Sequence, residues 1–222
     1  MFRILTLILT LTLIIGAPIM AKKAKAQAEN PLENTLYLDL KDGRVVIEMR
    51  PDLAPKHVAR IKELVRKGFY NGVVFHRVIE GFMAQTGDPT GTGSGGSGQK
   101  IKAEFSREPH MRGALSMARA ADINSADSQF FIVFSASTFL DGQYTYWGKV
   151  TSGMEFVDKI KKGSKSDNGS VTDPDKIIKM QVAADVAGAE AAPVAEAAPA
   201  APAAPTEAGV GVSIAAPATV AK

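Results

Sequence analysis

The sequence predicts a mainly β fold, a closed antiparallel barrel capped by two α-helices. Short runs of alternating apolar and polar residues recur along the middle of the chain, separated by glycine and other turn residues. Only two stretches carry apolar residues at helical spacing. Many short strands with so few helices favour a barrel whose ends the helices cover.

The first predicted elements are a hairpin and a helix. Thr35–Leu40 and Arg44–Met49 alternate on either side of Lys41-Asp42-Gly43, which is a turn signal. Pro55 begins the helix and Gly68 ends it. One face of this helix is apolar and consists of Val58, Ile61, Leu64 and Val65.

The rest of the domain reads as further strands and a second helix. The predicted strands are Val73–Val78, a short run after Gly81, Ala114–Met117, Phe130–Phe134, Tyr146–Val150 and Ile177–Val182, and the helix is Met154–Lys161. Alternation within the first of these strands places Phe75, Arg77 and Ile79 on the face opposite Val74, His76 and Val78.

Residues 91–98 form a segment with five glycines. The segment lacks the lysine that ends a P-loop, and no βαβ unit surrounds it, so a phosphate site is disfavoured. We expect a long flexible loop.

The two ends of the chain differ from its middle. Arg3, the largely apolar run Ile4–Ile15 and the small-x-small sequence Ala26-Gln27-Ala28 predict a secretory signal over residues 1–28. The apolar run is short for a membrane span, which favours cleavage over an uncleaved anchor. Residues 184–222 contain 17 alanines, 5 prolines and no aromatic residue, so we expect a disordered tail. A folded domain over residues 29–183 remains between them.

The composition excludes several classes of protein. Without cysteine there is no thiol nucleophile, disulfide framework or cysteine-based zinc site. The three histidines, His57, His76 and His110, are not at zinc-hydrolase spacing, and we expect neither metal nor cofactor. Residues 1–28 hold four basic residues and no acid, so cleavage lowers the formal charge from +3 to −1. No basic patch for nucleic acid then remains.

Hydrolytic catalysis is also poorly supported. Ser128 has no nucleophile motif around it. Asp88, Asp127 and Asp141 are scattered and typical of turns, so they do not form an acid/base pair.

The segment 75–88 carries the best candidate site. It combines the guanidinium of Arg77, the apolar side chains of Phe82 and Met83, and the amide of Gln85. One cation beside an apolar surface suits a neutral ligand that is both buried and hydrogen-bonded, rather than a phosphate. The alternative is a core strand with one arginine extending to solvent.

Later segments supply side chains that fit the same pocket. Gln129 and Phe131 share one face of a strand, and Phe139-Leu140 precedes a turn. The small Ala118 allows another backbone to approach closely. Each of these also fits ordinary core or loop packing, and Arg119 also fits a solvated surface charge.

Five motifs, taken in order, resemble the cyclophilins, a family of peptidyl-prolyl cis-trans isomerases. They are Phe75-His-Arg-Val-Ile-x-Gly-Phe-Met-x-Gln-x-Gly-Asp, Leu115-Ser-Met-Ala, Ser128-Gln-Phe-Phe-Ile, Leu140-Asp-Gly and Trp147-Gly-Lys-Val. The resemblance runs from about Asn34 to Gln181. It is nearest to the secreted bacterial branch, because of the signal and the Gly-Asp-Pro-Thr-Gly-Thr-Gly loop. It implies an eight-stranded cyclophilin-like barrel.

The resemblance also assigns roles to single residues. Arg77 resembles the catalytic arginine. The implied proline pocket is Phe82, Met83, Phe131 and Leu140, and the implied contacts to substrate backbone are Gln85, Ala118 and Gln129. Gly93 corresponds to a glycine of the neighbouring subsite.

Three positions at the rim depart from the family pattern. Phe139 stands where many members have tryptophan, which puts strong cyclosporin binding in doubt but not isomerisation. Tyr144 stands in place of histidine and Arg119 in place of asparagine, and these affect the rim and the contacts to substrate backbone.

The implied function is acceleration of rotation about X–Pro bonds. We expect a monomer that acts on proline-containing polypeptides and assists the folding of exported proteins in the periplasm. The alternative is a module that binds proline-containing segments without catalysis, or an envelope chaperone. The presence of both Arg77 and Gln85 favours the enzyme.

Overall fold

The structure is a computed structural model that describes residues 31–190. The predicted signal over residues 1–28 and residues 191–222 of the predicted tail lie outside the described residues. Within residues 31–190, no helix has the length and apolar character needed to cross a membrane.

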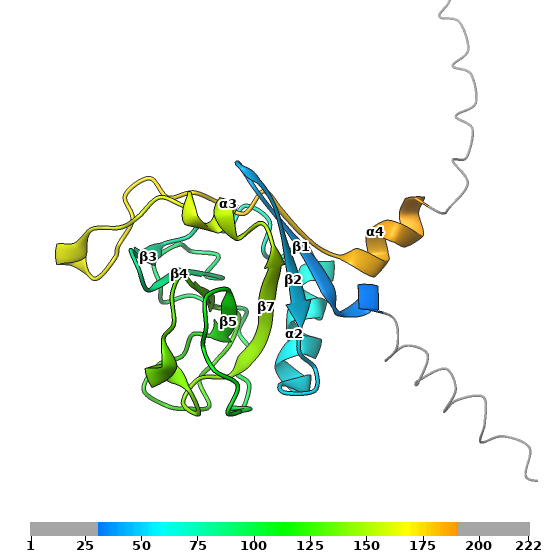
Figure 1. The fold of residues 1–222 in the computed structure, drawn as a ribbon, viewed down its shortest axis with the longest axis horizontal. Coiled ribbons are helices and arrows are strands. Elements are labelled where there is room, and N and C mark those ends of the chain that lie inside the picture. Colours follow the sequence, from blue (N-terminus) through cyan, green and yellow to red (C-terminus); the bar gives the residue numbers. More distant parts are fainter. Residues whose placement is uncertain (1–30, 191–222) are drawn as a thin grey trace, which may run out of the picture. The chain divides into compact units, whose positions relative to one another are not determined.

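Eight antiparallel strands form one curled sheet (Figure 1). Their order in the sheet is β3-β4-β6-β5-β7-β2-β1-β8. The strands are β1 Thr35–Leu40, β2 Gly43–Met49, β3 Arg77–Ile79, β4 Met83–Thr86, β5 Ala114–Met117, β6 Phe130–Val133, β7 Tyr146–Ser152 and β8 Lys179–Val182. The predicted hairpin over residues 35–49 is confirmed, with Leu40 opposite Gly43 at its turn.

The sheet is a half-barrel, so the predicted closed barrel is correct in its strands and not in its closure. Strands β3 and β8 are the two ends of the ladder. Isolated bridges, such as Val74 to Lys176, and separate backbone hydrogen bonds, such as Val78 N–H to Gly169 O over 2.7 Å, link their neighbourhoods without a continuous ladder. Asn168 and Asp173 have positive φ values of 47° and 52°. Because such residues interrupt extended backbone, segment 168–176 does not form a continuous ninth strand.

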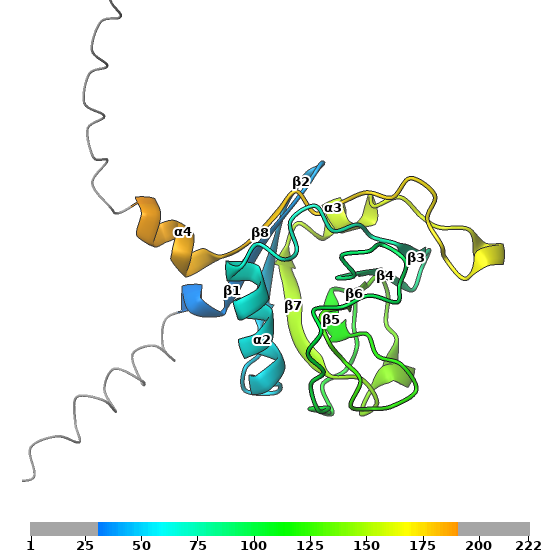
Figure 2. The same ribbon diagram turned by 180° about the vertical axis from the view of Figure 1, so that it is seen from behind.

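Three α-helices accompany the sheet in the described part of the chain. Helix α2 (Pro55–Arg66) lies across the face of β1 and β2 (Figure 2). Helix α3 (Met154–Asp158) ends before the predicted limit of Lys161. The backbone N–H of Lys161 donates to the Asp175 carboxylate instead of continuing the helix. Short 3-10 helices occur at Pro31–Asn34 (η1), Thr138–Leu140 (η2) and Lys165–Asp167 (η3).

Helix α4 (Ala183–Glu190) occupies the first residues of the predicted tail. The predicted disorder is therefore wrong for these residues. An ion pair of 3.0 Å between Arg66 and Asp185 joins α4 to α2, and alanine has the highest helix propensity of any residue.

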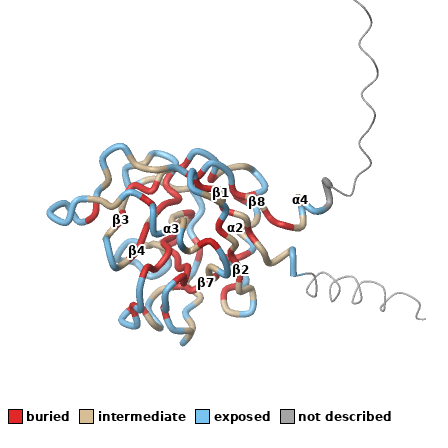
Figure 3. Tube along the Cα trace, turned by 45° about the horizontal axis from the view of Figure 1, so that its top comes forward, coloured by how far each residue is buried: buried red, intermediate tan, exposed pale blue. Residues whose placement is uncertain are grey.

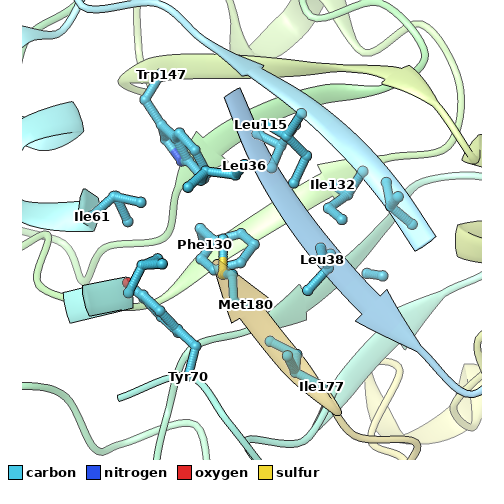
Figure 4. Packing of buried hydrophobic residues seen from close by; sticks show 14 of the residues in the cluster. Leu36, Leu38, Ile61, Tyr70, Leu115, Phe130, Ile132, Trp147, Ile177 and Met180 are labelled. Carbon is cyan, nitrogen blue, oxygen red and sulfur yellow. The ribbon is translucent and has the colours of Figure 1, made fainter. Parts of the chain in front are cut away.

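The main core lies between α2 and the concave side of the sheet. Leu36, Leu38, Phe130 and Trp147 are fully buried there (Figure 4). The Phe130 ring meets the Trp147 ring edge-to-face, with 5.3 Å between centroids. The buried positions follow the strands, whereas the connecting loops are largely exposed (Figure 3).

A second, smaller group of buried side chains lies apart from the main core. We call it the pocket cluster; its members are Met83, Ala114, Phe131, Val133, Leu140 and Tyr146. Because β4, β6 and β5 are neighbours in the sheet, residues distant in sequence meet here.

Candidate active site

The register of two short strands places the candidate cation. Gly81, with a φ of 74°, turns the chain between β3 and β4, and Arg77 then lies directly opposite Gln85. Opposite residues in an antiparallel pair share a face of the sheet. Arg77 Nη1 accordingly donates to Gln85 Oε1 over 3.1 Å.

A loop far along the chain holds the other edge of this guanidinium. Arg77 Nε donates to the carbonyl oxygen of Asn168 over 3.0 Å, and Nη2 donates to Asn168 Oδ1 over 2.9 Å. Burial lowers the pKa of Arg77, but an arginine stays protonated at any ordinary pH. Asn168 and Gln85 thus fix the orientation of a permanent cation.

The hydrogen bonds continue from Arg77 across the sheet. Gln85 Nε2 donates to Gln129 Oε1 over 2.9 Å. Gln129 Nε2 in turn donates to the carbonyl oxygens of Gly93 and Gly95, over 2.9 Å and 2.8 Å. The amides therefore order one another, and the Gln129 amide also holds the glycine-rich loop.

Apolar side chains form the wall that faces this polar row. Met83, Phe131 and Leu140 are buried, and Phe82 packs against them. The rings of Phe82 and Phe139 lie 5.5 Å apart, and Phe139 is 64% exposed, which places it on the rim. The result is an apolar hollow with a fixed guanidinium on one side.

The hollow is a cavity of about 680 Å³. It brings together all the sequence-predicted site residues except Gln129, namely Arg77, Phe82, Met83, Gln85, Gly93, Ala118, Arg119, Phe131, Phe139, Leu140 and Tyr144. Gln129 lines the smaller cavity beside it. Five further residues of the lining were not predicted from the sequence: His76, Thr92, Asp167, Asn168 and Ser170. His76 precedes Arg77 in the quoted motif, but Asn168 lies in a segment without any local signal.

The glycine-rich loop beside the cavity is tied down by two carboxylates. Asp88, fully buried, accepts hydrogen bonds from the N–H groups of Gly93 and Gly95 over 2.6 Å and 3.0 Å, and from Thr90. Burial opposes its ionisation, but these hydrogen bonds outweigh burial and hold the pKa of Asp88 well below its usual range. Asp127 accepts from Ser97 N over 2.8 Å.

Asp88 and Asp127 were predicted only as turn residues, but these contacts show that they hold the glycine-rich loop in place. A Cβ at Gly95 would lie 2.1 Å from Asp88 Oδ1, so the loop needs glycine there to approach the carboxylate. The glycines allow close approach of the loop to its anchors.

The rim carries a second cation, Arg119. Its guanidinium lies over the ring of Tyr144, 4.7 Å from the centroid. The Tyr144 ring in turn meets Phe131 edge-to-face. Arg119 is thus held in a defined position rather than fully solvated.

The lining of the cavity combines charged, polar and apolar side chains. Two guanidinium groups, Arg77 and Arg119, stand beside amides and apolar groups, and the Thr92 hydroxyl is held by Asp88 at the glycine-rich loop. Among residues 31–190, no group of three or more histidine, aspartate or glutamate side chains is arranged to hold a metal ion. The arrangement suits binding and reorienting a neutral, partly apolar group.

Comparison with known sequences gives a consistent answer. The family model described as "Cyclophilin type peptidyl-prolyl cis-trans isomerase/CLD" matches residues 35–182. A "Probable peptidyl-prolyl cis-trans isomerase" of Brucella suis is 59% identical over 172 residues, which cover 72% of this chain and 87% of the relative. "Peptidyl-prolyl cis-trans isomerase B" of Bacillus subtilis is 47% identical over 132 residues, covering 58% and 92%.

Solved structures with the same fold are also cyclophilins. The cyclophilin AquaCyp293 from Hirschia baltica matches with a TM-score of 0.62 and 28% identity, over 74% of this chain and 80% of its own. A cyclophilin-type isomerase of Cryptosporidium parvum, crystallised in the presence of the dipeptide Ala-Pro, matches with a TM-score of 0.61 and 31% identity, over 67% and 98%.

Proposed function

We propose a mechanism and a setting for this chain, which belongs to the cyclophilin-type peptidyl-prolyl cis-trans isomerase family. Its reaction is rotation about the X–Pro peptide bond. The observation that carries the mechanism is the guanidinium of Arg77, fixed on both edges beside an apolar hollow.

The chemical problem is the partial double bond of the amide. Delocalisation of the nitrogen lone pair into the carbonyl gives a rotation barrier of about 18–20 kcal/mol. In the twisted transition state, the proline nitrogen becomes pyramidal and regains its lone pair. A hydrogen-bond donor aimed at that nitrogen stabilises the twisted state more than the planar ground state, which is the condition for catalysis.

Arg77 supplies this donor. Its orientation is set before substrate arrives, by Asn168 on one edge and Gln85 on the other, so little reorganisation accompanies the reaction. A differential gain on the order of 5–7 kcal/mol gives roughly four to five decades in rate.

The apolar wall and the amides orient the substrate. Phe82, Met83, Phe131 and Leu140 bury the proline ring. Gln85 and the backbone near Ala118 hold the flanking chain while the other side of the bond turns. Gln129 acts from the adjoining cavity, where it also anchors the loop.

Arg77→Ala tests this role. We expect kcat/KM on an Xaa-Pro peptide to fall at least about tenfold, roughly 1.4 kcal/mol or more, with the far-UV circular dichroism spectrum retained. Arg77→Lys is the matched variant: it keeps the charge but loses the planar donor geometry, so we expect partial activity. Unchanged turnover in Arg77→Ala would remove Arg77 from the mechanism and favour the pocket as a binding module.

The setting we propose is the periplasm, with exported proline-containing polypeptides as substrates. The signal-like sequence over residues 1–28 supports this proposal. Fractionation of cells that express the full chain, with sequencing of the mature N-terminus, tests it. Recovery of uncleaved chain in the cytoplasmic fraction would contradict it.

A further inference from the structure

A second cavity adjoins the proline pocket. It has a volume of about 360 Å³ and shares Gln85, Gly93, Ala118 and Arg119 with the larger cavity. Much of its remaining lining is small, including Gly95, Gly96 and Ala120. Small residues leave room for a side chain of a peptide whose proline occupies the larger cavity.

Two cations line this second cavity, Lys100 and Arg119. Arg119 donates to the backbone carbonyl oxygens of Ala120, Ala121 and Gln143, over 2.9 Å, 3.5 Å and 3.2 Å, and its guanidinium lies over the Tyr144 ring. Within residues 31–190, no carboxylate lies within 4.0 Å of either the Lys100 or the Arg119 cation. Neither positive charge is therefore neutralised by a carboxylate of these residues.

The single acidic residue in the lining of this cavity is already engaged. Asp127 Oδ1 accepts from Ser97 N over 2.8 Å and from the Ser97 hydroxyl, and Oδ2 accepts from Gly98 N over 2.9 Å. Its oxygens are directed to the glycine-rich loop. The lining as a whole carries one more positive than negative charge.

We propose that Arg119 and Lys100 make this isomerase prefer substrates with an acidic side chain close to the proline. The inference rests on the proposed function, because it takes the larger cavity as the site of the proline ring. An extended chain advances about 3.3–3.6 Å per residue, so side chains one to three positions from the proline reach an adjoining cavity. Of the four residues that line both cavities, Arg119 is the charged one.

Partly exposed ion pairs are weak, which sets the size of the effect. Each cation contributes roughly a 1.5- to 5-fold gain in kcat/KM for a substrate carboxylate. A lysine at the same position is disfavoured by repulsion. We therefore expect a Glu-to-Lys ratio in kcat/KM of about 3 to 20 at low salt, shrinking in 0.5 M salt.

The experiment measures exchange rates by NMR for peptides that differ only in Glu, Gln or Lys at one of three positions on either side of the proline. Exchange NMR avoids a coupling protease with its own charge preference. Arg119→Gln should reduce the Glu-to-Lys ratio, Lys100→Gln should reduce it less, and Arg119→Lys should retain it. Lys102→Gln is the control, an equal charge change outside both cavity linings.

Two results would overturn the proposal: equal rates for the three peptides at every position, or a Glu-to-Lys ratio that both Arg119→Gln and Lys100→Gln leave unchanged. Failure of the proposed function would look different. The unmodified chain would then fail to accelerate exchange in the neutral Gln peptides as well.

Discussion

The molecule contains two apolar clusters that differ in what covers them. The main core is enclosed by the sheet and α2, and Leu36, Leu38 and Trp147 have no exposed surface. The pocket cluster is also buried, but three of its members, Met83, Phe131 and Leu140, line the cavity. At the edge of the cavity stand Phe82, Tyr144 and the largely exposed Phe139. Folding encloses the main core completely, whereas part of the pocket cluster forms the wall of a cavity.

This difference separates stability from function. Burial of apolar area in an enclosed core stabilises the fold, and no apolar surface of that core is left for a ligand to contact. An apolar hollow that stays open to solvent gains its remaining burial only when a proline ring enters it. The same chemical deletion should therefore have different consequences in the two clusters.

The largest expected effect is on the main core. Leu36→Ala, on β1, removes a fully buried side chain and should lower the free energy of unfolding by about 2–5 kcal/mol. Urea unfolding followed by circular dichroism measures this. Because β1 contributes nothing to the cavity lining, kcat/KM per folded molecule should stay within about twofold of the unmodified chain. A large loss of activity in the folded fraction would show that the main core also contributes to catalysis, against this prediction.

The matched change in the pocket cluster is Leu140→Ala. Leu140, on η2, is 4% exposed and lines the cavity. We expect a stability loss near the lower end of the same range, about 2 kcal/mol, because the open side of the site permits relaxation. The loss of proline contacts should lower kcat/KM by about 1–3 kcal/mol, or roughly 5- to 150-fold. Equal activity in the two leucine variants would refute the distinction between the clusters.

The smallest expected effect is a pH dependence at the edge of the pocket. Burial lowers the pKa of His76, and this outweighs the opposing attraction of Asp88. Below about pH 6.5, His76 therefore binds a proton more readily in the unfolded chain, where a histidine pKa is near 6.5, than in the folded chain. Stability should be fully present above about pH 6.5 and should fall as the pH drops through the folded pKa.

Urea unfolding at pH 8 and pH 5 measures this change. His76→Gln should reduce the pH dependence without abolishing it, because burial also lowers the pKa of His57. An unaltered pH dependence in His76→Gln would show that His76 does not contribute.

Much of the fold was predictable from local pattern. Alternation gave β1 and β5 with their observed limits, and Pro55 and Gly68 gave the limits of α2 closely. Closure and α4 were not predictable in the same way. Closure of the barrel depends on the positive-φ residues Asn168 and Asp173, which have no local sequence signal. Helix α4 is a short part of a long segment whose overall composition is typical of disorder.

Alternation failed at one informative place. Phe75 and Val78 were predicted on opposite faces, yet both lie in the main core. The regular strand begins only at Arg77, so the period of two does not hold across residues 75–78. Local pattern thus located the candidate residue Arg77 but not all of its neighbours.

The candidate site was largely predictable because its residues occur in recognisable ordered motifs. Its supporting contacts were not. Asn168, which orients Arg77, lies 91 positions away in the sequence. Asp88 and Asp127 looked like turn residues, because a carboxylate that gathers backbone N–H groups has the same local pattern as one that begins a turn.

The pairing of β3 with β4 has a consequence for how this site tolerates sequence change. Side chains in a strand alternate in parity, and Arg77, Gln85 and Phe131 meet because three strands are in phase. A one-residue insertion or deletion in the turn around Gly81 inverts that parity and directs the Gln85 amide toward the core side. Length variation in this turn is therefore expected only in steps that preserve phase, whereas the exposed rim at Phe139 is free to change residue by residue.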